Sequence, residues 1–244
     1  SSKFGVDAAQ AELLVEQALR QGTVVEGFSF HVGSQLSDPT PFRSAVRQTL
    51  DLMDALETRF SVRFQTLDIG GGIPAAYDRE VVDLEHVADA MMPLINERAG
   101  DLDVLAEPGR IMVADTMTLV TRVVGVADRS GSRWYYLDDG LYGSYSNVLT
   151  EGVHPLVLSE SEVRGVPPTA RATLAGPTCD STDVIGKSMP VPDLQVGDLM
   201  LSPTMGAYTS VTASRFNGRA LTPIITLGEH PRSLVGCSLA SSKN

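Results

Sequence analysis

Thr66-Leu67-Asp68-Ile69-Gly70-Gly71-Gly72 joins a short apolar strand pattern directly to three glycines. Residues 42–60 before this stretch and 84–95 after it place apolar side chains at helical spacing. A strand pattern that ends in a glycine turn between two helical patterns is typical of a βα unit in a parallel sheet. The stretch therefore predicts an α/β fold for this part of the chain.

The same arrangement of a strand followed by a polar motif occurs twice more. Residues 24–30 form a β-branched and aromatic run that leads to His31, and residues 104–106 lead to Glu107. A further helical pattern covers residues 7–21, with Asp7 as its expected N-cap. Functional groups at the carboxyl ends of parallel strands are what the active face of a (β/α) barrel requires.

Beyond Arg110 the pattern changes to short strands separated by Gly, Pro and Asp. These predicted strands cover residues 117–126, 133–137, 170–175, 198–202 and 221–226. We expect a polar, proline-rich loop at 159–169 and no long helix. The pattern predicts an all-β second domain, and the unpatterned residues 231–244 are expected to form a mobile tail.

Composition excludes several classes of protein. Hydrophobic residues make up 43% and charged residues 20% of the 244, as in ordinary globular proteins. The net charge of -11, without a long basic run, argues against nucleic-acid binding through phosphate neutralisation. No apolar run approaches the roughly 20 residues that span a bilayer. The N-terminus has no signal pattern and two cysteines cannot form a disulfide framework, so we expect a cytoplasmic protein.

Metal and nucleotide sites are not expected either. His86, His154 and His230 have no metal-ligand spacing with one another or with the cysteines. Lys187 lies in a Gly-Lys-Ser triplet that lacks the upstream glycine of a P-loop.

The glycine triplet allows two interpretations. Glycines after a strand can form a tight βα turn, or they can let backbone amides converge on an anion because no Cβ blocks close approach. Ser34 and Arg110 can add a hydroxyl and a guanidinium to such a site. Together these groups favour a phosphate cradle over a simple turn.

Five short motifs occur in a fixed order along the chain: Ser29-Phe30-His31-Val32-Gly33-Ser34, Asp68-Ile69-Gly70-Gly71-Gly72, Glu107-Pro108-Gly109-Arg110, Gly176-Pro177-Thr178-Cys179-Asp180 and Gly206-Ala207-Tyr208-Thr209. In this order they resemble the pyridoxal-phosphate-dependent ornithine/diaminopimelate/arginine decarboxylase family, with its alanine-racemase-like barrel, and the ornithine and lysine branch most. The resemblance spans nearly all of residues 2–226. It implies the C-terminal portion of a (β/α)8 TIM-type barrel at 1–112 and a β-rich domain, barrel- or sandwich-like, at 113–230.

The resemblance implies a cofactor site for pyridoxal 5'-phosphate. His31 would stack on the ring of the cofactor, and Glu107 would pair with the protonated ring nitrogen, so that the ring can accept electrons. The phosphate would be held by Ser34, Gly70, Gly71, Gly72, Gly109, Arg110 and Tyr208. Read alone, His31 could be a structural histidine, and Glu107 could cap a helix or form an ion pair.

The resemblance also implies that the active site is shared across a homodimer. Cys179 would return a proton to the decarboxylated intermediate, and Asp180 would contact the distal amine of the substrate. Read alone, Cys179 could be a small buried apolar residue and Asp180 a turn residue. Where ornithine-type members carry a Tyr-Asp pair, this chain has Thr150-Glu151, so Glu151 is a second candidate for the distal amine with a longer reach.

The family's cofactor-anchoring lysine precedes the His31 motif, and none of Lys3, Lys187 and Lys243 matches it. The chain thus resembles the later part of such an enzyme. We expect decarboxylation of a basic L-amino acid of the ornithine or lysine class to a diamine, as in polyamine biosynthesis. Diaminopimelate, arginine or diaminobutyrate are alternative substrates. The other alternative is a catalytically silent homologue that acts as a regulatory binding protein.

Overall fold

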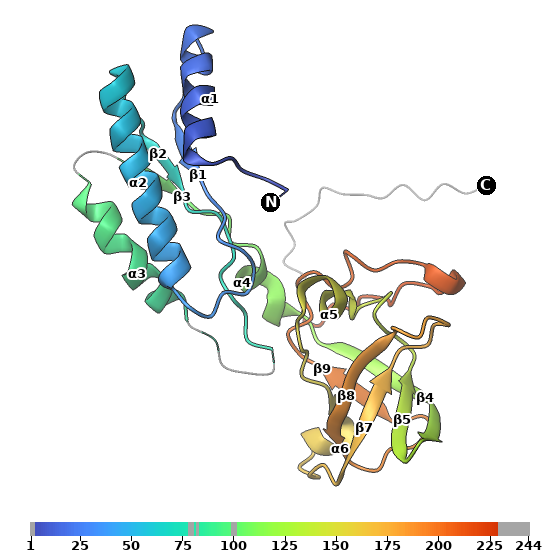
Figure 1. The fold of residues 1–244 in the computed structure, drawn as a ribbon. Helices are drawn as coiled ribbons and strands as arrows, with labels where there is room; N and C mark the ends of the chain where they lie inside the picture. Colours follow the sequence, from blue (N-terminus) through green and yellow to red (C-terminus); the bar gives the residue numbers. More distant parts are fainter. Residues whose placement is uncertain (1–2, 78–80, 82, 99–101, 229–244) are drawn as a thin grey trace.

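The chain folds around two separate hydrophobic cores. The computed structural model describes residues 3–77, 81, 83–98 and 102–228. One core joins apolar side chains between Val15 and Ile95, and the other joins side chains between Leu119 and Met205. Figure 1 shows the two parts next to each other, with the short helix α4 (Arg110–Val113) near the junction. The predicted domain limits at 112/113 and 230 stay predictions.

The first part is built on a three-stranded parallel sheet. Its strands are paired in chain order, and they are β1 (Gly27–Ser29), β2 (Thr66–Asp68) and β3 (Asp103–Leu105). The intervening helices are α2 (Thr40–Phe60) and α3 (Leu84–Glu97), which pack against each other in Figure 1, while α1 (Ala8–Arg20) precedes β1. This curled α/β arrangement is that of part of a (β/α) barrel.

Local sequence explains where these helices begin and which face they bury. The Asp7 and Asp83 carboxylates accept hydrogen bonds from the backbone N–H groups of Gln10 and His86, which satisfies donors in the first helical turn. Helix α2 buries one stripe, consisting of Phe42, Val46, Leu50, Met53 and Leu56. This stripe has the spacing of a helix with one face toward a core. The predicted helix positions are therefore confirmed to within a few residues.

The second part is built on a six-stranded sheet in the order β6-β9-β4-β5-β7-β8. The strands are β4 (Leu119–Arg129), β5 (Ser132–Leu137), β6 (Leu158–Ser159), β7 (Ala170–Ala175), β8 (Val184–Val191) and β9 (Leu199–Ser202). All pairs are antiparallel except β5 with β7. In its core, the Tyr145 and Ser202 hydroxyls lie 2.8 Å apart, and burial raises the pKa of Tyr145 to about 12.

Several expectations for this second part were wrong or incomplete. Residues 221–226 form no strand, because their exposed apolar side chains face no neighbouring strand with which to pair. Strand β8 was missed, since its Gly, Lys, Ser and Pro residues break the usual strand pattern; as an edge strand it tolerates Pro190. The expected loop at 159–169 begins with helix α6 (Glu160–Val163), and the short helix α5 (Ser146–Glu151) was also missed. The predicted tail at 231–244 lies outside the described residues.

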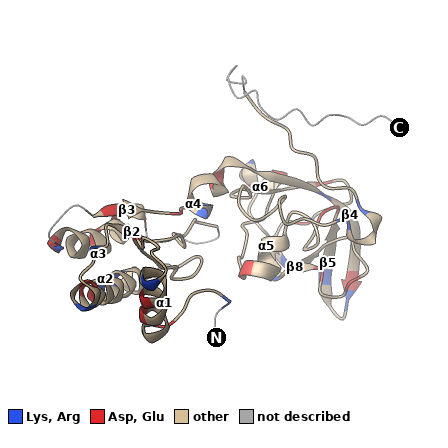
Figure 2. Cartoon of the chain, turned by 90° about the horizontal axis from the view of Figure 1, so that it is seen from above, with Lys and Arg blue, Asp and Glu red and all other residues tan. Residues whose placement is uncertain are grey.

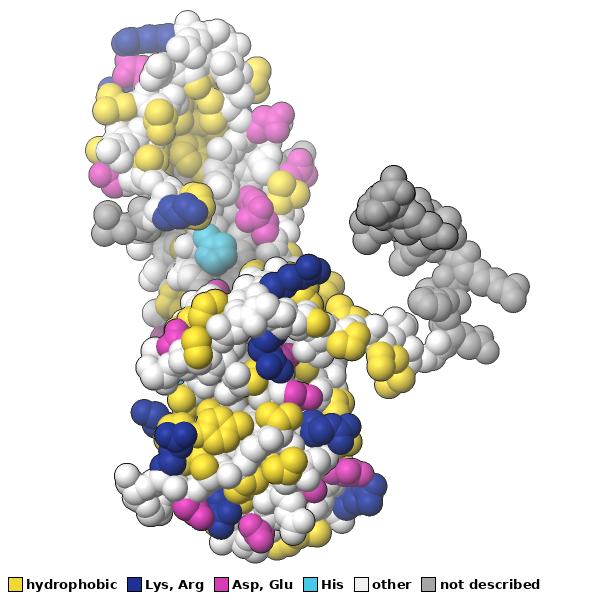
Figure 3. Space-filling view, turned by 90° about the vertical axis from the view of Figure 1, so that its right-hand side faces the viewer, with side chains coloured by type: hydrophobic (Ala, Val, Ile, Leu, Met, Phe, Trp, Pro, Cys, Tyr) yellow, Lys and Arg dark blue, Asp and Glu magenta, His cyan; other side chains and the backbone are white. Residues whose placement is uncertain are grey.

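The surface carries charges of both signs. Figure 2 shows Asp and Glu together with Lys and Arg on both parts of the chain, and Figure 3 shows hydrophobic side chains lying among them on one side. Within the residues described here, no helix has the length and apolar character needed to cross a membrane.

Candidate functional site

The candidate site lies where the three parallel strands end. His31, Gly71 and Glu107 each follow one of the strands β1, β2 and β3 within a few residues, so they meet at one edge of the sheet. A pocket of about 240 Å³ opens there. Its lining consists of His31, Ser34, Gly71, Gly72, Ile73, Glu107, Gly109, Arg110, Glu151 and Tyr208. The structure thus brings together every predicted cofactor ligand except Gly70, which lies next to Gly71 in the same turn.

The glycine turn needs its glycines. Gly70 and Gly72 have φ angles of +65° and +96°, which side chains rarely adopt, and a Cβ on Gly71 would lie 2.7 Å from the Glu107 carbonyl oxygen. The Gly70 N–H donates to Asp68 Oδ1 at 2.9 Å, and the Glu107 N–H donates to the Gly70 carbonyl at 2.9 Å. Among the described residues, the N–H groups of Gly71 and Gly72 donate to no protein acceptor. These two amides are available to an anion.

Arg110 is the buried cation of the pocket, with 4% of its side chain exposed. Its Nη1 donates to the Tyr77 hydroxyl at 2.7 Å, and its Nη2 donates to Ser34 Oγ at 3.2 Å and to Glu151 Oε2 at 3.0 Å. The guanidinium carbon lies 4.7 Å from the centre of the Tyr208 ring, a cation–π distance. Arg110 therefore links the first part of the chain to both α5 and the loop that carries Tyr208.

Tyr208 has a φ of 54°, a left-handed conformation that is uncommon for a bulky residue. Such outliers occur where surrounding contacts hold a functional geometry. Its hydroxyl lies 3.4 Å from the point where a Cβ on Gly109 would be, so glycine at 109 permits the close approach. Tyr208 and Gly109 thus both line the pocket, and the phosphate-binding role that the resemblance implies for them stays a prediction.

His31 and Glu107 complete the pocket. Nδ1 of His31 accepts a hydrogen bond from the Gly33 N–H at 3.1 Å, which leaves the ring proton of a neutral imidazole on Nε2. That Nε2 lies 3.5 Å from the point where a Cβ on Gly71 would be, so the imidazole lies over the glycine turn. Glu107 is exposed to the pocket. The roles predicted for these two side chains stay predictions.

Cys179 and Asp180 lie elsewhere, in the turn between β7 and β8, and neither lines the pocket just described. Asn217 holds the exposed Cys179: its Oδ1 accepts from the Cys179 N–H at 2.9 Å, and its Nδ2 donates to Sγ at 3.5 Å. Asp180 accepts hydrogen bonds from Thr182 and from the Tyr142 hydroxyl. The bond from Tyr142 lowers the pKa of Asp180, and the Asp180 acceptor raises the pKa of Tyr142.

Asp183 shapes this turn and was not among the predicted site residues. It is 2% exposed and accepts hydrogen bonds from the Leu141 N–H at 2.7 Å and the Thr178 hydroxyl at 2.6 Å. Gly140 and Gly176 make room for it, because a Cβ on either would lie within 2.3 Å of its carboxylate. These two glycines were the signal in the sequence that could have identified a buried side chain here. Asn217 and Tyr77 carried no comparable signal.

Glu151 lies in the pocket with Arg110, whereas Asp180 bonds to Tyr142 and Thr182. Glu151 also lines a second pocket of about 220 Å³, together with Ser34, Tyr77 and His154. The role of Glu151 toward a substrate amine stays a prediction.

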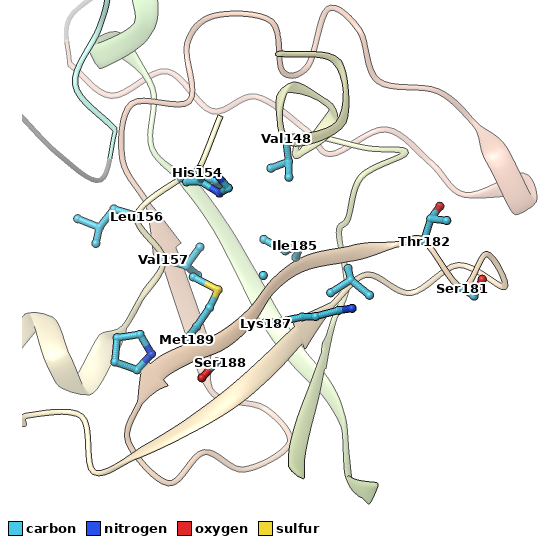
Figure 4. Close-up of a pocket in the computed structure, with 14 residues that line it drawn as sticks. Val148, His154, Leu156, Val157, Ser181, Thr182, Ile185, Lys187, Ser188 and Met189 are labelled. Carbon is cyan, nitrogen blue, oxygen red and sulfur yellow. The ribbon is translucent and has the colours of Figure 1, made fainter. Parts of the chain in front are cut away.

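A larger pocket, of about 810 Å³, runs along β8 (Figure 4). His154, Ile185, Lys187 and Met189 are among its lining residues, and no predicted site residue is. The larger volume of this pocket is therefore no reason to regard it as the site that the sequence motifs predict.

Comparison with known proteins finds similar sequences and structures. The family model described as "Pyridoxal-dependent decarboxylase, pyridoxal binding domain" matches residues 1–114. The lysine/ornithine decarboxylase of Selenomonas ruminantium is 35% identical over 233 residues, which are 95% of this chain and 58% of that protein. Antizyme inhibitor 2 of Xenopus laevis is 33% identical over 239 residues, covering 92% of this chain and 52% of that protein.

A solved structure is similar over nearly the whole chain. The lysine/ornithine decarboxylase of Vibrio vulnificus, complexed with cadaverine, superposes with a TM-score of 0.87 at 38% identity, covering 94% of this chain and 62% of that one. The chain thus spans somewhat more than half the length of these relatives. With the motifs, the pocket and these similarities taken together, the chain belongs to the family of pyridoxal-dependent decarboxylases that includes the lysine and ornithine decarboxylases.

Proposed function

We propose that the protein to which this chain belongs decarboxylates a basic L-amino acid of the ornithine or lysine class to a diamine, a reaction of polyamine biosynthesis. The observation that carries the proposal is the convergence of His31, Glu107 and Arg110 with the glycine turn in one pocket. Its relatives named lysine/ornithine decarboxylase support the same substrate class. A cytoplasmic location stays a prediction.

The pocket fits the phosphate of pyridoxal 5'-phosphate. Arg110 supplies a buried guanidinium whose Nε has no partner among the described residues. Gly71 and Gly72 line the same pocket, and their N–H groups donate to no protein acceptor among those residues. Ser34 and Tyr208 add hydroxyl donors. When bound, the cofactor supplies an electron sink for the electron pair left on Cα after loss of carbon dioxide.

Two further residues of the pocket, His31 and Glu107, would hold and orient the ring of the cofactor. The His31 imidazole, whose Nε2 lies close to Gly71, would fix the plane of the cofactor. Glu107 offers a carboxylate that would keep a proton on the pyridine nitrogen, since a negative charge close by favours the cationic form. Both residues follow the carboxyl ends of strands, His31 after β1 and Glu107 after β3.

Cys179 and Asp180 would reach the reaction from a partner chain. Cys179 would donate a proton to Cα, and the Asp180 carboxylate would hold the distal ammonium of the substrate. The position of both outside the pocket of their own chain supports a site shared between two subunits. Glu151 lines the pocket and is the second carboxylate available to the ammonium.

A regulatory homologue without catalysis is the second candidate. The similarity to antizyme inhibitor 2 favours it. The presence of His31, Glu107, Arg110, Cys179 and Tyr208 favours the enzyme, because a protein that only binds a partner has no need of them. An absorbance scan of the purified full-length protein separates the two, since a lysine-bound cofactor absorbs near the violet edge of the visible range.

Replacing Arg110 with Ala should weaken cofactor binding by at least tenfold, because a charge-assisted hydrogen bond contributes about 1.5–3 kcal/mol. Binding is measured by calorimetry with the full-length protein. The matched control is Arg164→Ala, which removes an exposed arginine just after α6 and should leave the affinity unchanged. Equal affinity of Arg110→Ala and the unmodified protein would remove Arg110 from the phosphate site.

The substrate should carry a distal cation. We expect carbon dioxide release from ornithine or lysine, and release from norleucine lower by on the order of 10⁴, since a site built around a polar contact rejects analogues that lack it. Asp180→Asn should lower turnover of both diamino acids. Norleucine decarboxylated as fast as lysine would disprove the basic-substrate proposal.

A shared site predicts complementation between two inactive variants. Cys179→Ala chains keep the pocket, and Arg110→Ala chains keep the Cys179 turn, so a mixed dimer regains one intact site. If subunits exchange at random, activity should return to about a quarter of the unmodified level, given isologous pairing with two sites per dimer. Subunit exchange is verified with differently tagged chains. Proven exchange without any return of activity would show that each chain builds its own site.

A further inference from the structure

Glu151 and Arg110 form an ion pair between the two parts of the chain. Glu151 Oε2 lies 3.0 Å from Arg110 Nη2, and the side chains are 27% and 4% exposed. The carboxylate reaches the guanidinium from the last residue of α5, whereas Arg110 begins α4. The ion pair therefore occupies a cation that the phosphate of the cofactor would also need.

The charges of the pocket make the two anions competitors. Its lining holds one arginine and two carboxylates, those of Glu107 and Glu151. A phosphate placed at the Arg110 guanidinium would lie beside the Glu151 carboxylate, and like charges at such short range repel strongly where solvent is partly excluded. Glu151 must therefore leave Arg110 before the phosphate binds well.

The structure gives Glu151 freedom to move and fixes Arg110. Arg110 is held by the Tyr77 hydroxyl and the Tyr208 ring. Glu151 is partly exposed and is followed by Gly152, which has a φ of 63° and ends the helix. Glu151 also lines a pocket of about 220 Å³ whose lining does not include Arg110, so its side chain has space to turn into.

We propose that the Glu151 carboxylate is a displaceable occupant of the anion site at Arg110, so that a phosphate monoester binds by exchange with it. In the exchange, the Arg110 guanidinium pairs with the phosphate instead of with Glu151. The Glu151 carboxylate is then left without its ion-pair partner. A free carboxylate at the edge of the pocket is then ready to accept the distal ammonium of the substrate. This inference rests on the proposed function for the identity of the phosphate ligand.

The test measures binding of pyridoxamine 5'-phosphate by calorimetry, which needs neither turnover nor a Schiff base. Glu151→Gln keeps the size of the side chain and removes its charge, so it should bind this ligand on the order of tenfold more tightly than the unmodified protein. Glu151→Ala should also bind more tightly and serves if the first variant folds poorly. The control is Glu160→Gln, which removes the same charge from an exposed pair on α6 and should leave affinity unchanged.

Pyridoxamine, which lacks the phosphate, shows which group competes with Glu151. The affinity for pyridoxamine should not rise in Glu151→Gln, because this ligand has no phosphate that would compete with the Glu151 carboxylate for Arg110. Equal or weaker binding of the phosphate ligand by both Glu151 variants would overturn the exchange and leave the proposed cofactor site intact. An equal gain for pyridoxamine would also overturn it. No binding by any of these proteins, the unmodified one included, would overturn both the exchange and the proposed function.

Discussion

The buried guanidinium of Arg110 is the interaction on which the candidate site depends. A buried charge is costly unless it is paired, and here Tyr77, Ser34, Glu151 and the Tyr208 ring together surround it. These partners come from the first part of the chain, from α5 and from the loop after β9. The same cation therefore attaches the six-stranded part to the barrel-like part and defines where an anion binds. Arg110 thus serves both the folded structure and the proposed chemistry.

The parallel sheet explains why residues so far apart in sequence meet at Arg110. Parallel strands bring their carboxyl ends to one edge, so His31, Gly71 and Glu107 become neighbours without any direct sequence signal between them. The short glycine turn lines the same pocket, and the absence of side chains there permits close approach to the backbone. The antiparallel sheet places Cys179 and Asp180 in a different turn, which fits a division of labour between two subunits in the proposed reaction.

The sequence predicted the first part well because its signals are local. Helical spacing, the N-cap at Asp7 and the glycines after β2 each depend on a few neighbouring residues. The predictions were wrong where long-range contacts determine the secondary structure. Residues 221–226 have a strand-like composition but no partner strand. Strand β8 forms despite Pro190 because it pairs with β7 on one side only. Tyr77 and Asn217 could not be predicted, since each acts through a residue 33 or 38 positions away. The Glu151–Arg110 pair likewise exists only once both parts are folded.

We propose that one pocket, at the ends of the three parallel strands and lined by Arg110 and Tyr208, holds the phosphate of the cofactor. A crystal structure of the full-length protein with pyridoxamine 5'-phosphate tests it most directly. We expect the phosphate within hydrogen-bonding distance of the Gly71 and Gly72 amides and of Arg110, with the ring beside His31 and Glu107. A ligand bound instead in the pocket along β8, beside Lys187, would contradict it.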